Sequence, residues 1–301
     1  MSNIFPGKVG FAIGTGRCGT TFLYRVMSEE PNIAASHERN HLLESFHKYC
    51  SWNELPVDEE GFLAEKEREI NEDLGWAEFS FESSGHLSFS VPALSGRFQA
   101  RFVLLVRNPL RVVSSYVHKG YYEQPFRQQK TDLALGFQPG REFHHFLGRV
   151  APRHEEFHRW NEMTQVGKVA WFWKALNQRS LQLLEQLPTT DWTLIRLEDL
   201  NFARYQSLTQ MFGFESQLAA DNFDQLRQQR PNSSSSSLRI PEWSDREISE
   251  FEQEIGDLSA RLGYPSTFAD CVDQASTVAS AEKKSSKRPG RSFYARLGLS
   301  G

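Results

Sequence analysis

A glycine-rich turn near the start of the sequence has the residue types that bind anions. An apolar run at residues 9–13 leads into Gly14, Gly16 and Gly19, and a helix is expected from Thr20. Glycines allow a sharp turn and bring backbone N–H groups close to a ligand, while a helix N-terminus favours negative charge at the same point. The stretch therefore predicts a binding site for a phosphate or a sulfate group.

The glycine spacing alone leaves the identity of this anion open. Gly14-x-Gly16-x-x-Gly19 matches the fingerprint of dinucleotide-binding folds, and Glu38 lies about where that fingerprint has its ribose-binding acid. The kinase-type phosphate loop, GxxxxGK[ST], is excluded because the turn contains no lysine. A nicotinamide or flavin oxidoreductase is therefore one interpretation, and a glycine turn without a ligand is another.

Charged and hydroxyl side chains around the turn favour a smaller anion. Arg17 lies inside the turn, and Thr20 and Thr21 follow its last glycine. These groups suit a compact, highly charged phosphate or sulfate better than a pyrophosphate that lies against bare backbone.

A second candidate anion site lies at a strand–helix junction in the middle of the chain. Residues 101–106 predict a parallel strand that is buried on both faces. Asn108 suits a helix N-cap and Pro109 suits the first helical position, so a helix is expected to follow. Arg107 then lies at the end of the strand and Ser115 about two turns into the helix, where both could face one small anion. A surface arginine next to two helical serines is the alternative interpretation.

Ionisable residues also gather after a weaker predicted strand at residues 32–37. His37, Glu38, Arg39 and His41 lie at or just beyond its carboxyl end. In open α/β sheets this is the edge where ligands bind. These side chains are therefore expected to lie near a bound ligand.

The remaining pattern predicts one α/β domain, with a central parallel sheet flanked by helices, over residues 1–270. Further strands are expected at residues 76–81 and 192–196. Helices are expected at residues 41–48, 58–74, 169–187 and 244–262, and the charged helix at 58–74 is expected to be a solvated face. Residues 271–301 are basic and rich in Ser and Lys, which predicts a disordered tail.

Net charge, cysteine content and the length of apolar runs limit the binding partners and the cellular compartment to be expected. The formal net charge of −4 argues against a general nucleic-acid binder, so any polyanion has to be held by locally placed arginines. Three widely spaced cysteines predict a reducing compartment and no disulfide framework. No apolar run has the length of a transmembrane helix, and the first predicted strand leaves no room for a signal peptide. We expect a cytoplasmic protein, and the sequence does not indicate its oligomeric state.

The stretch His154–His158 matches the HExxH motif of zinc peptidases. Its setting argues against a metal site, because Glu156 puts a charge where such helices pack on the core, and Arg153 and Arg159 add competing cations. No metal is therefore predicted. The aromatic and histidine-rich stretch at residues 119–162, which includes Phe126, Phe137, Phe143, His144 and His145, is expected either to line a substrate pocket or to pack in the core.

Three stretches, in this order, resemble the sulfotransferases that use 3′-phosphoadenosine 5′-phosphosulfate (PAPS). They are Gly14–Leu23, Arg107–Tyr116 and Ile195–Leu200, and the resemblance spans about residues 8–212. It implies a P-loop-like α/β fold and transfer of a sulfuryl group to a hydroxyl or amine acceptor, such as a small molecule, a carbohydrate or a lipid. A non-catalytic protein that keeps the nucleotide site is the alternative.

The resemblance also assigns residues. It implies that the 5′-phosphosulfate is bound by Gly16, Arg17, Cys18, Gly19, Thr20 and Thr21, and the 3′-phosphate by Arg107 and Ser115. Cys18 stands where many members have serine, which removes one hydroxyl contact. Arg17, where many cytosolic members have lysine, is closer to the carbohydrate-modifying and bacterial branches. A glutamate is the base in those branches, and Glu38 takes its place here, with His37 and His41 as rivals.

Overall fold

The computed structural model describes residues 5–123, 147–229 and 240–286. Of the predictions above, those for Phe126, Phe137, Phe143, His144 and His145 and for the last part of the tail lie outside these residues. None of the helices in the described ranges combines the length and the apolar character needed to cross a membrane.

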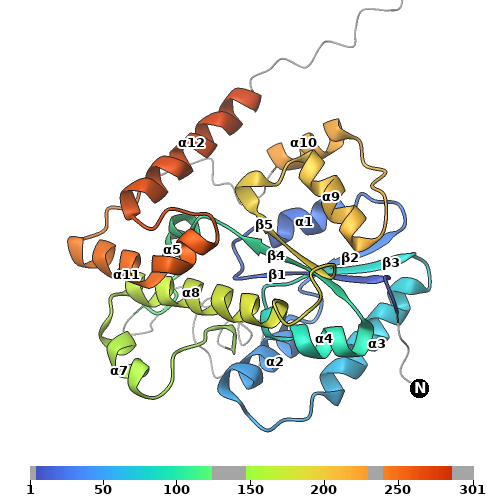
Figure 1. Cartoon of the computed structure of the whole chain (residues 1–301), viewed down its shortest axis with the longest axis horizontal. Helices are drawn as coiled ribbons and strands as arrows, with labels where there is room; N and C mark the ends of the chain where they lie inside the picture. Colours follow the sequence, from blue (N-terminus) through green and yellow to red (C-terminus); the bar gives the residue numbers. More distant parts are fainter. Residues whose placement is uncertain (1–4, 124–146, 230–239, 287–301) are drawn as a thin grey trace, which may run out of the picture.

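Five strands in the described part of the chain form one parallel sheet, in the order β2-β3-β1-β4-β5 (Figure 1). The strands are β1 (Val9–Gly14), β2 (Ile33–His37), β3 (Phe79–Ser83), β4 (Arg101–Val106) and β5 (Trp192–Arg196). Because all pairs are parallel, the carboxyl ends of β1, β2, β3 and β4 meet at one edge of the sheet. The α/β fold class predicted from the sequence is confirmed.

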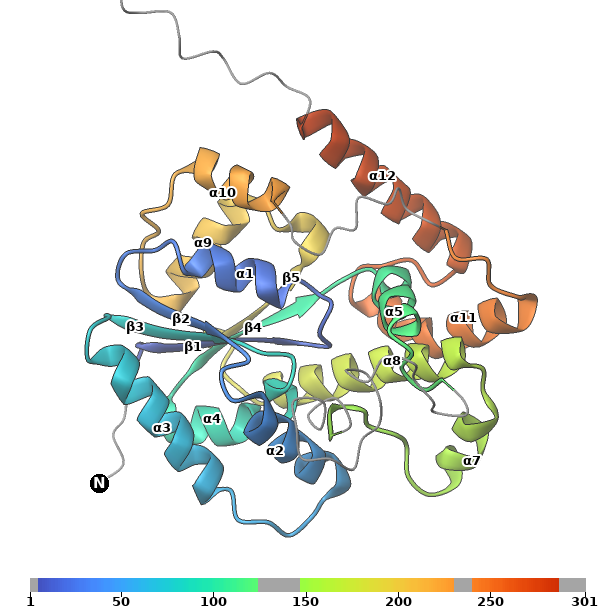
Figure 2. The same ribbon diagram turned by 180° about the vertical axis from the view of Figure 1, so that it is seen from behind.

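Helices cover both faces of the sheet. The α-helices are α1 (Thr20–Met27), α2 (His41–Asn53), α3 (Glu60–Leu74), α4 (Val91–Phe98), α5 (Pro109–His118), α7 (Glu155–Glu162), α8 (Gln165–Leu184), α9 (Phe202–Phe212), α10 (Ala220–Gln228), α11 (Asp245–Arg261) and α12 (Phe268–Ser286). Short 3₁₀ helices lie at Leu87–Phe89 and Leu197–Asp199. Helices α1, α9 and α10 lie on one side of the sheet, and α2, α3, α4 and α8 on the other (Figures 1 and 2).

The alternation of side chains along the strands builds a core on each side. Phe102, Leu104 and Val106 of β4 pack in the cluster that includes α4 and α8, whereas Val103 and Leu105 pack with α1 and α9. This two-sided burial is the reason why β4 reads as a continuous apolar run. The apolar stripe of α8 belongs to the first of these cores, as its spacing predicts.

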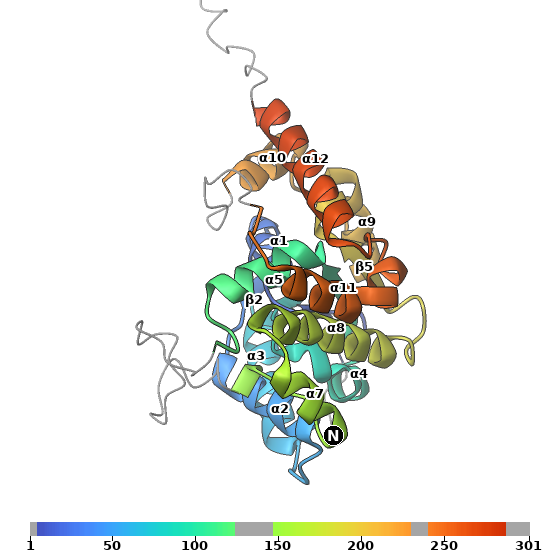
Figure 3. The same cartoon turned by 90° about the vertical axis from the view of Figure 1, so that its left-hand side faces the viewer.

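Two parts of the chain differ from expectation. Helix α3 is not simply a solvated face, because Lys66 is fully buried and Glu69 is almost so. Helix α12 crosses the boundary predicted at residue 270, and Cys271 and Ala275 in its first turns are buried. Its far end extends away from the body of the protein (Figure 3). The first turns of α12, which lie in the stretch predicted as a tail, are therefore anchored by these buried side chains.

Candidate active site

The turn that joins β1 to α1, Thr15–Gly19, has the sharp backbone that its glycines predict. We call it the glycine turn. Gly16 and Gly19 have φ angles of 77° and 107°, which side chains rarely allow. A Cβ atom at Gly16 would overlap the hydroxyl of Tyr116, and one at Gly19 would come within 2.5 Å of Leu197. Both glycines are therefore required by backbone conformation and by close packing.

The junction between β4 and α5 is tied directly to the glycine turn. Arg107 donates from Nη1 to the carbonyl oxygen of Arg17 at 3.0 Å, and Arg17 donates from Nε to the hydroxyl of Ser115 at 2.8 Å. The buried hydroxyl of Tyr116 donates to the carbonyl oxygen of Thr15 at 2.6 Å. The two anion sites predicted from separate motifs thus lie side by side. The Nη1 and Nη2 atoms of Arg17 have no partner among the described residues.

The other predicted ligands of the turn have different surroundings. The hydroxyls of Thr21 and Thr20 lie 3.2 Å and 3.4 Å from Nε2 of His37, so this histidine contacts the first turn of α1. The thiol of Cys18 is fully buried, and burial raises its pKa. Cys18 can therefore offer a ligand only its backbone N–H. His41 is half-buried at the start of α2.

Glu38 follows the last residue of β2 in a left-handed backbone conformation, with a φ of 47°. Its half-buried carboxylate makes no hydrogen bond or ion pair within the described ranges. Burial raises the pKa of Tyr116 and of Tyr121; the Glu38 carboxylate adds to both increases and the Arg17 guanidinium opposes them. Glu38 and Arg17 therefore both influence the pKa values of Tyr116 and Tyr121, so the two charges lie near the same pair of tyrosines.

Lys48 of α2 lies beside the glycine turn, and the sequence did not single it out. Its ammonium group is buried, donates to the carbonyl oxygen of Gly85 at 3.2 Å, and lies over the ring of Phe89 at 5.5 Å. Gly85 in turn packs against Gly16, because a Cβ atom added to Gly85 would come within 3.1 Å of the Gly16 nitrogen. Burial lowers the pKa of Lys48 to about 7, and the Glu38 carboxylate opposes this shift.

The structure explains why Lys48 was missed. Helix α2 buries Glu44, His47 and Lys48 while it leaves Leu42 and Phe46 45% and 48% exposed. This is the reverse of an ordinary amphipathic helix, so hydrophobic periodicity misleads there. The only signal in the sequence is the position of α2 directly after the ionisable cluster at residues 36–41.

Two other interpretations can be compared with the geometry. In dinucleotide-binding folds the second strand lies next to the first, but here β3 lies between β1 and β2, so Glu38 is not where the ribose-binding acid belongs. In the HExxH stretch, His154 precedes α7 with a φ of 56° and a ψ of −137°, so the two histidines do not share a helical face. Within the described ranges no three His, Cys, Asp or Glu side chains are grouped to hold a metal ion.

No protein-family profile matches the sequence, and no curated protein is significantly similar to it. Solved structures of sulfotransferases do align with it. The sulfotransferase STF9 from Mycobacterium avium aligns with a TM-score of 0.53 and 11% sequence identity, over 87% of this chain and 78% of that one. The sulfotransferase domain of the Synechococcus PCC 7002 olefin synthase aligns with a TM-score of 0.45 and 12% identity, over 96% of this chain and 98% of that one. The sulfotransferase domain from the curacin biosynthetic pathway gives a TM-score of 0.41 and 13% identity, over 97% and 95% of the two chains.

The class of fold follows from the sheet order, the glycine turn and the alignment with STF9. It is an α/β fold with a P-loop-like glycine turn after β1. More particularly, the chain has the fold of the sulfotransferases, as its three motifs predict.

Proposed function

We propose that this chain is a sulfotransferase that moves the sulfuryl group of PAPS to a hydroxyl or amine acceptor. The observation that carries the proposal is the contact between the two predicted phosphate sites, in which Arg107 and Ser115 both bond to Arg17 of the glycine turn. A donor with phosphate groups at both ends of one nucleoside needs two anion sites close together. The fold shared with STF9 supports the same reading.

The residues around the glycine turn fit such a donor. The free Nη atoms of Arg17, the N–H groups of the turn and the N-terminus of α1 would hold the 5′-phosphosulfate. Arg107 and Ser115 would hold the 3′-phosphate. In its protonated form, Lys48 would add a further positive charge beside the turn.

In the proposed reaction, PAPS supplies a sulfuryl group on a phosphate leaving group. Glu38 accepts the proton of the acceptor as the acceptor oxygen or nitrogen bonds to sulfur. The bond between sulfur and the bridging oxygen breaks, and 3′-phosphoadenosine 5′-phosphate leaves. Arg17 and the turn N–H groups stabilise the charge that grows on the bridging oxygen. A general base contributes roughly 10² to 10⁴-fold to such a step.

The acceptor is proposed only as a class: a small molecule, a carbohydrate or a lipid that carries a hydroxyl or amine group. Glu38 lies at the carboxyl edge of the sheet, the edge at which the glycine turn also lies. An acceptor would therefore approach along this edge. A panel of such compounds with radiolabelled donor would identify it.

Isothermal calorimetry tests the proposed donor. We expect the purified protein to bind 3′-phosphoadenosine 5′-phosphate and not to bind NAD(P) or flavin. The opposite result would establish the oxidoreductase interpretation of the glycine spacing. Binding of the nucleotide without turnover of any acceptor in the panel would instead favour a non-catalytic nucleotide-binding protein.

A further inference from the structure

The turn that carries Glu38 is held by an unusual set of acceptors. We call residues Glu38–Asn40 the glutamate turn. The N–H of Glu38 donates to the carbonyl oxygen of Ser83 at 3.2 Å. The next two N–H groups donate to side chains instead: that of Arg39 to Oε1 of Glu82 at 3.2 Å, and that of Asn40 to Oε1 of Glu44 at 3.1 Å.

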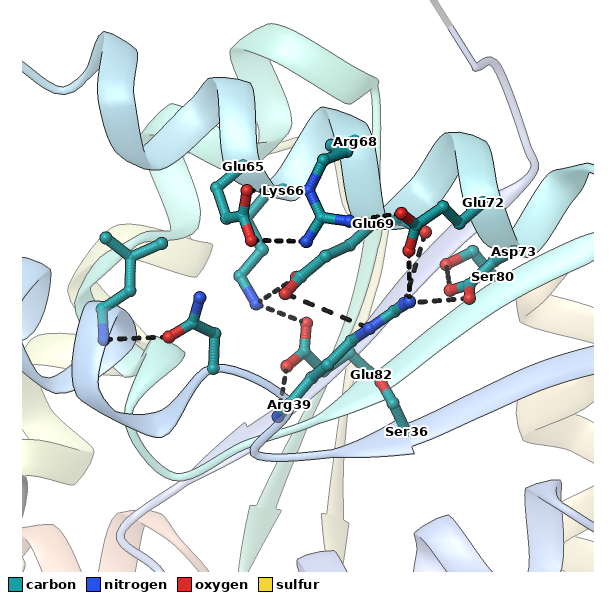
Figure 4. Close-up of polar contacts among 12 residues, drawn as sticks. Ser36, Arg39, Glu65, Lys66, Arg68, Glu69, Glu72, Asp73, Ser80 and Glu82 are labelled. Carbon is teal, nitrogen blue, oxygen red and sulfur yellow. Dashed lines mark hydrogen bonds and ion pairs between the residues drawn. The ribbon is translucent and has the colours of Figure 1, made fainter. Parts of the chain in front are cut away.

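Both carboxylates belong to a buried charge cluster formed by Glu44, Lys66, Glu69 and Glu82. Nζ of Lys66 lies 2.9 Å from Glu69 and 2.8 Å from Glu82 (Figure 4). It also lies 2.8 Å from Glu44, and all four residues are buried. The cluster joins α2, α3 and β3 beneath the glutamate turn. Each of Glu44 and Glu82 thus contacts Lys66 and one N–H group of that turn.

The side chain of Arg39 adds a second attachment to α3. Its Nη1 donates to Oδ1 of Asp73 at 2.9 Å and to the carbonyl oxygen of Glu69 at 3.2 Å, and its Nη2 lies 3.1 Å from Glu72 (Figure 4). The residue after Glu38 is therefore fixed through both its backbone and its side chain.

Two physical arguments indicate that the buried charge cluster serves to hold the glutamate turn. A left-handed backbone at a non-glycine residue such as Glu38 is strained and persists only where its surroundings hold it. Buried ion pairs, in turn, contribute little net stability compared with apolar packing, because the charges lose their hydration. The cluster directs its acceptor oxygens to the strained turn, so its benefit lies in fixing that turn.

The charge balance of the cluster points to one neutral carboxyl group. Three carboxylates surround Lys66, and the Arg39 guanidinium, 4.0 Å from Glu69, is a second cation, so full ionisation would still leave an excess of negative charge. Burial and the neighbouring Glu44 raise the pKa of Glu82 well above its usual value, while Lys66 opposes the shift. Burial is the largest single influence on Glu44 and raises its pKa, but the charge of Lys66 and hydrogen bonds with Glu82, Lys66 and Ser84 together lower that pKa to about 2. A glutamine at position 82 would therefore resemble the native side chain in charge.

We infer that the buried charge cluster is a positioning device that holds the glutamate turn, so that the Glu38 carboxylate is presented to the acceptor in one geometry. This inference rests on the proposed function where it concerns turnover. The members of the cluster are positioning residues, because the turn lies between them and the reacting atoms.

The test compares Glu82→Met with Glu82→Gln. Methionine removes the acceptor for the Arg39 N–H and keeps an apolar volume, whereas glutamine keeps an oxygen acceptor. Glu30→Met is the matched control, since Glu30 is a buried carboxylate that accepts from the N–H of Gln217 at 2.8 Å on the other side of the sheet. Amide hydrogen exchange of residues 38–40 is measured for each protein. Calorimetry with 3′-phosphoadenosine 5′-phosphate and the kcat and KM for an acceptor follow.

In Glu82→Met we expect exchange at residues 38–40 to be about tenfold faster, which corresponds to the loss of one hydrogen bond. We expect kcat to fall roughly 10- to 100-fold through misplacement of Glu38, with unchanged nucleotide affinity. Glu82→Gln should be close to wild type in both the exchange rate and kcat. Glu30→Met should change neither quantity. Should Glu82→Met fail to fold, Arg39→Ala removes only the guanidinium contacts and should give smaller changes in the same direction.

The outcomes test the positioning role and the proposed function separately. Unchanged exchange in Glu82→Met and Arg39→Ala would overturn the positioning role, and so would faster exchange with an unchanged kcat. Equal losses in Glu82→Gln and Glu82→Met would show that an oxygen acceptor at position 82 is not sufficient to hold the turn, which also overturns the positioning role. A wild-type protein that binds no 3′-phosphoadenosine 5′-phosphate would refute the proposed function. The exchange rates would still test the hold on the turn, because they require no ligand.

Discussion

The glycine turn after β1 and the glutamate turn after β2 lie at the same edge of the sheet but are fixed by different means. Hydrogen bonds from the Tyr116 hydroxyl and the Arg107 guanidinium hold backbone carbonyls of the glycine turn, and its glycines accept close packing from Tyr116 and Leu197. The N–H groups of the glutamate turn are instead held by a backbone carbonyl and two buried carboxylates.

This difference matches what each turn would have to do. In the proposed site the glycine turn would need its N–H groups for an anion, which leaves its carbonyl groups and its packing as the means of holding it. The glutamate turn would present a side chain, so its N–H groups are available as attachment points. In the proposed site, the donor would meet backbone N–H groups of the glycine turn, and the base would be carried on backbone whose own N–H groups are all occupied.

The largest expected effect that separates the two turns comes from Glu38→Gln. We expect kcat to fall roughly 10² to 10⁴-fold, because the acceptor loses its proton acceptor. The affinity for 3′-phosphoadenosine 5′-phosphate should stay the same, since the glycine turn is untouched. Steady-state kinetics and calorimetry on the same preparation measure both quantities.

The control for this variant is Glu78→Gln, an exposed glutamate just before β3. It should leave both quantities unchanged. Full turnover in Glu38→Gln would remove Glu38 from the mechanism and direct attention to His37 or His41. The assignment of the base to the glutamate turn and of the donor to the glycine turn would then be wrong.

A smaller effect is expected from Arg107→Ala, which acts on the glycine-turn side. Loss of a charged hydrogen bond to the 3′-phosphate should weaken binding of 3′-phosphoadenosine 5′-phosphate by roughly 10- to 100-fold. AMP, which lacks that phosphate, should lose much less affinity. Calorimetry with both nucleotides measures the difference.

Arg204→Ala is the control, because Arg204 is exposed on α9 and belongs to neither turn. Equal weakening of both nucleotides by Arg107→Ala would mean that Arg107 acts only through its bond to the Arg17 carbonyl. The 3′-phosphate site would then have to lie elsewhere.

Sequence reasoning could find the glycine turn because its determinants are local. The spacing of Gly14, Gly16 and Gly19 forces a backbone shape, and the apolar run before it and the helix after it are strong patterns. Likewise, β4 and the start of α5 follow from a buried apolar run and an Asn-Pro pair. Even there the detail differs, since the side chain of Asn108 donates to Cys271 and Gln274 rather than capping α5.

The support of the glutamate turn could not be found in the same way. Its determinants are four charged residues on α2, α3 and β3, which come together only in the folded chain. On α3, a lysine and a glutamate three residues apart look like an ordinary solvated pair. Charge spacing along one helix does not report that a strand residue such as Glu82 lies beneath it.

Lys48 gives the smallest predicted effect and links the two turns. Its ammonium donates to Gly85, which packs on Gly16, and its charge interacts with Glu38. The folded-state pKa of about 7 is below the usual 10.5. Between these values the unfolded chain binds more protons than the folded one, so this lysine makes the protein more stable as pH rises through that window.

Lys48→Met should remove this contribution. Relative to the variant, wild type should gain at most about 1.4 kcal/mol of unfolding free energy per pH unit above pH 7, and nothing per unit well below it. Urea unfolding of both proteins from pH 6 to pH 9 measures the difference, and Lys174→Met, at a partly exposed lysine on α8, is the control. A constant difference across this range would show that Lys48 keeps its proton throughout. Lys48 would then be a permanent cation between the turns, and an anion bound at the glycine turn would gain from it at every pH in the range.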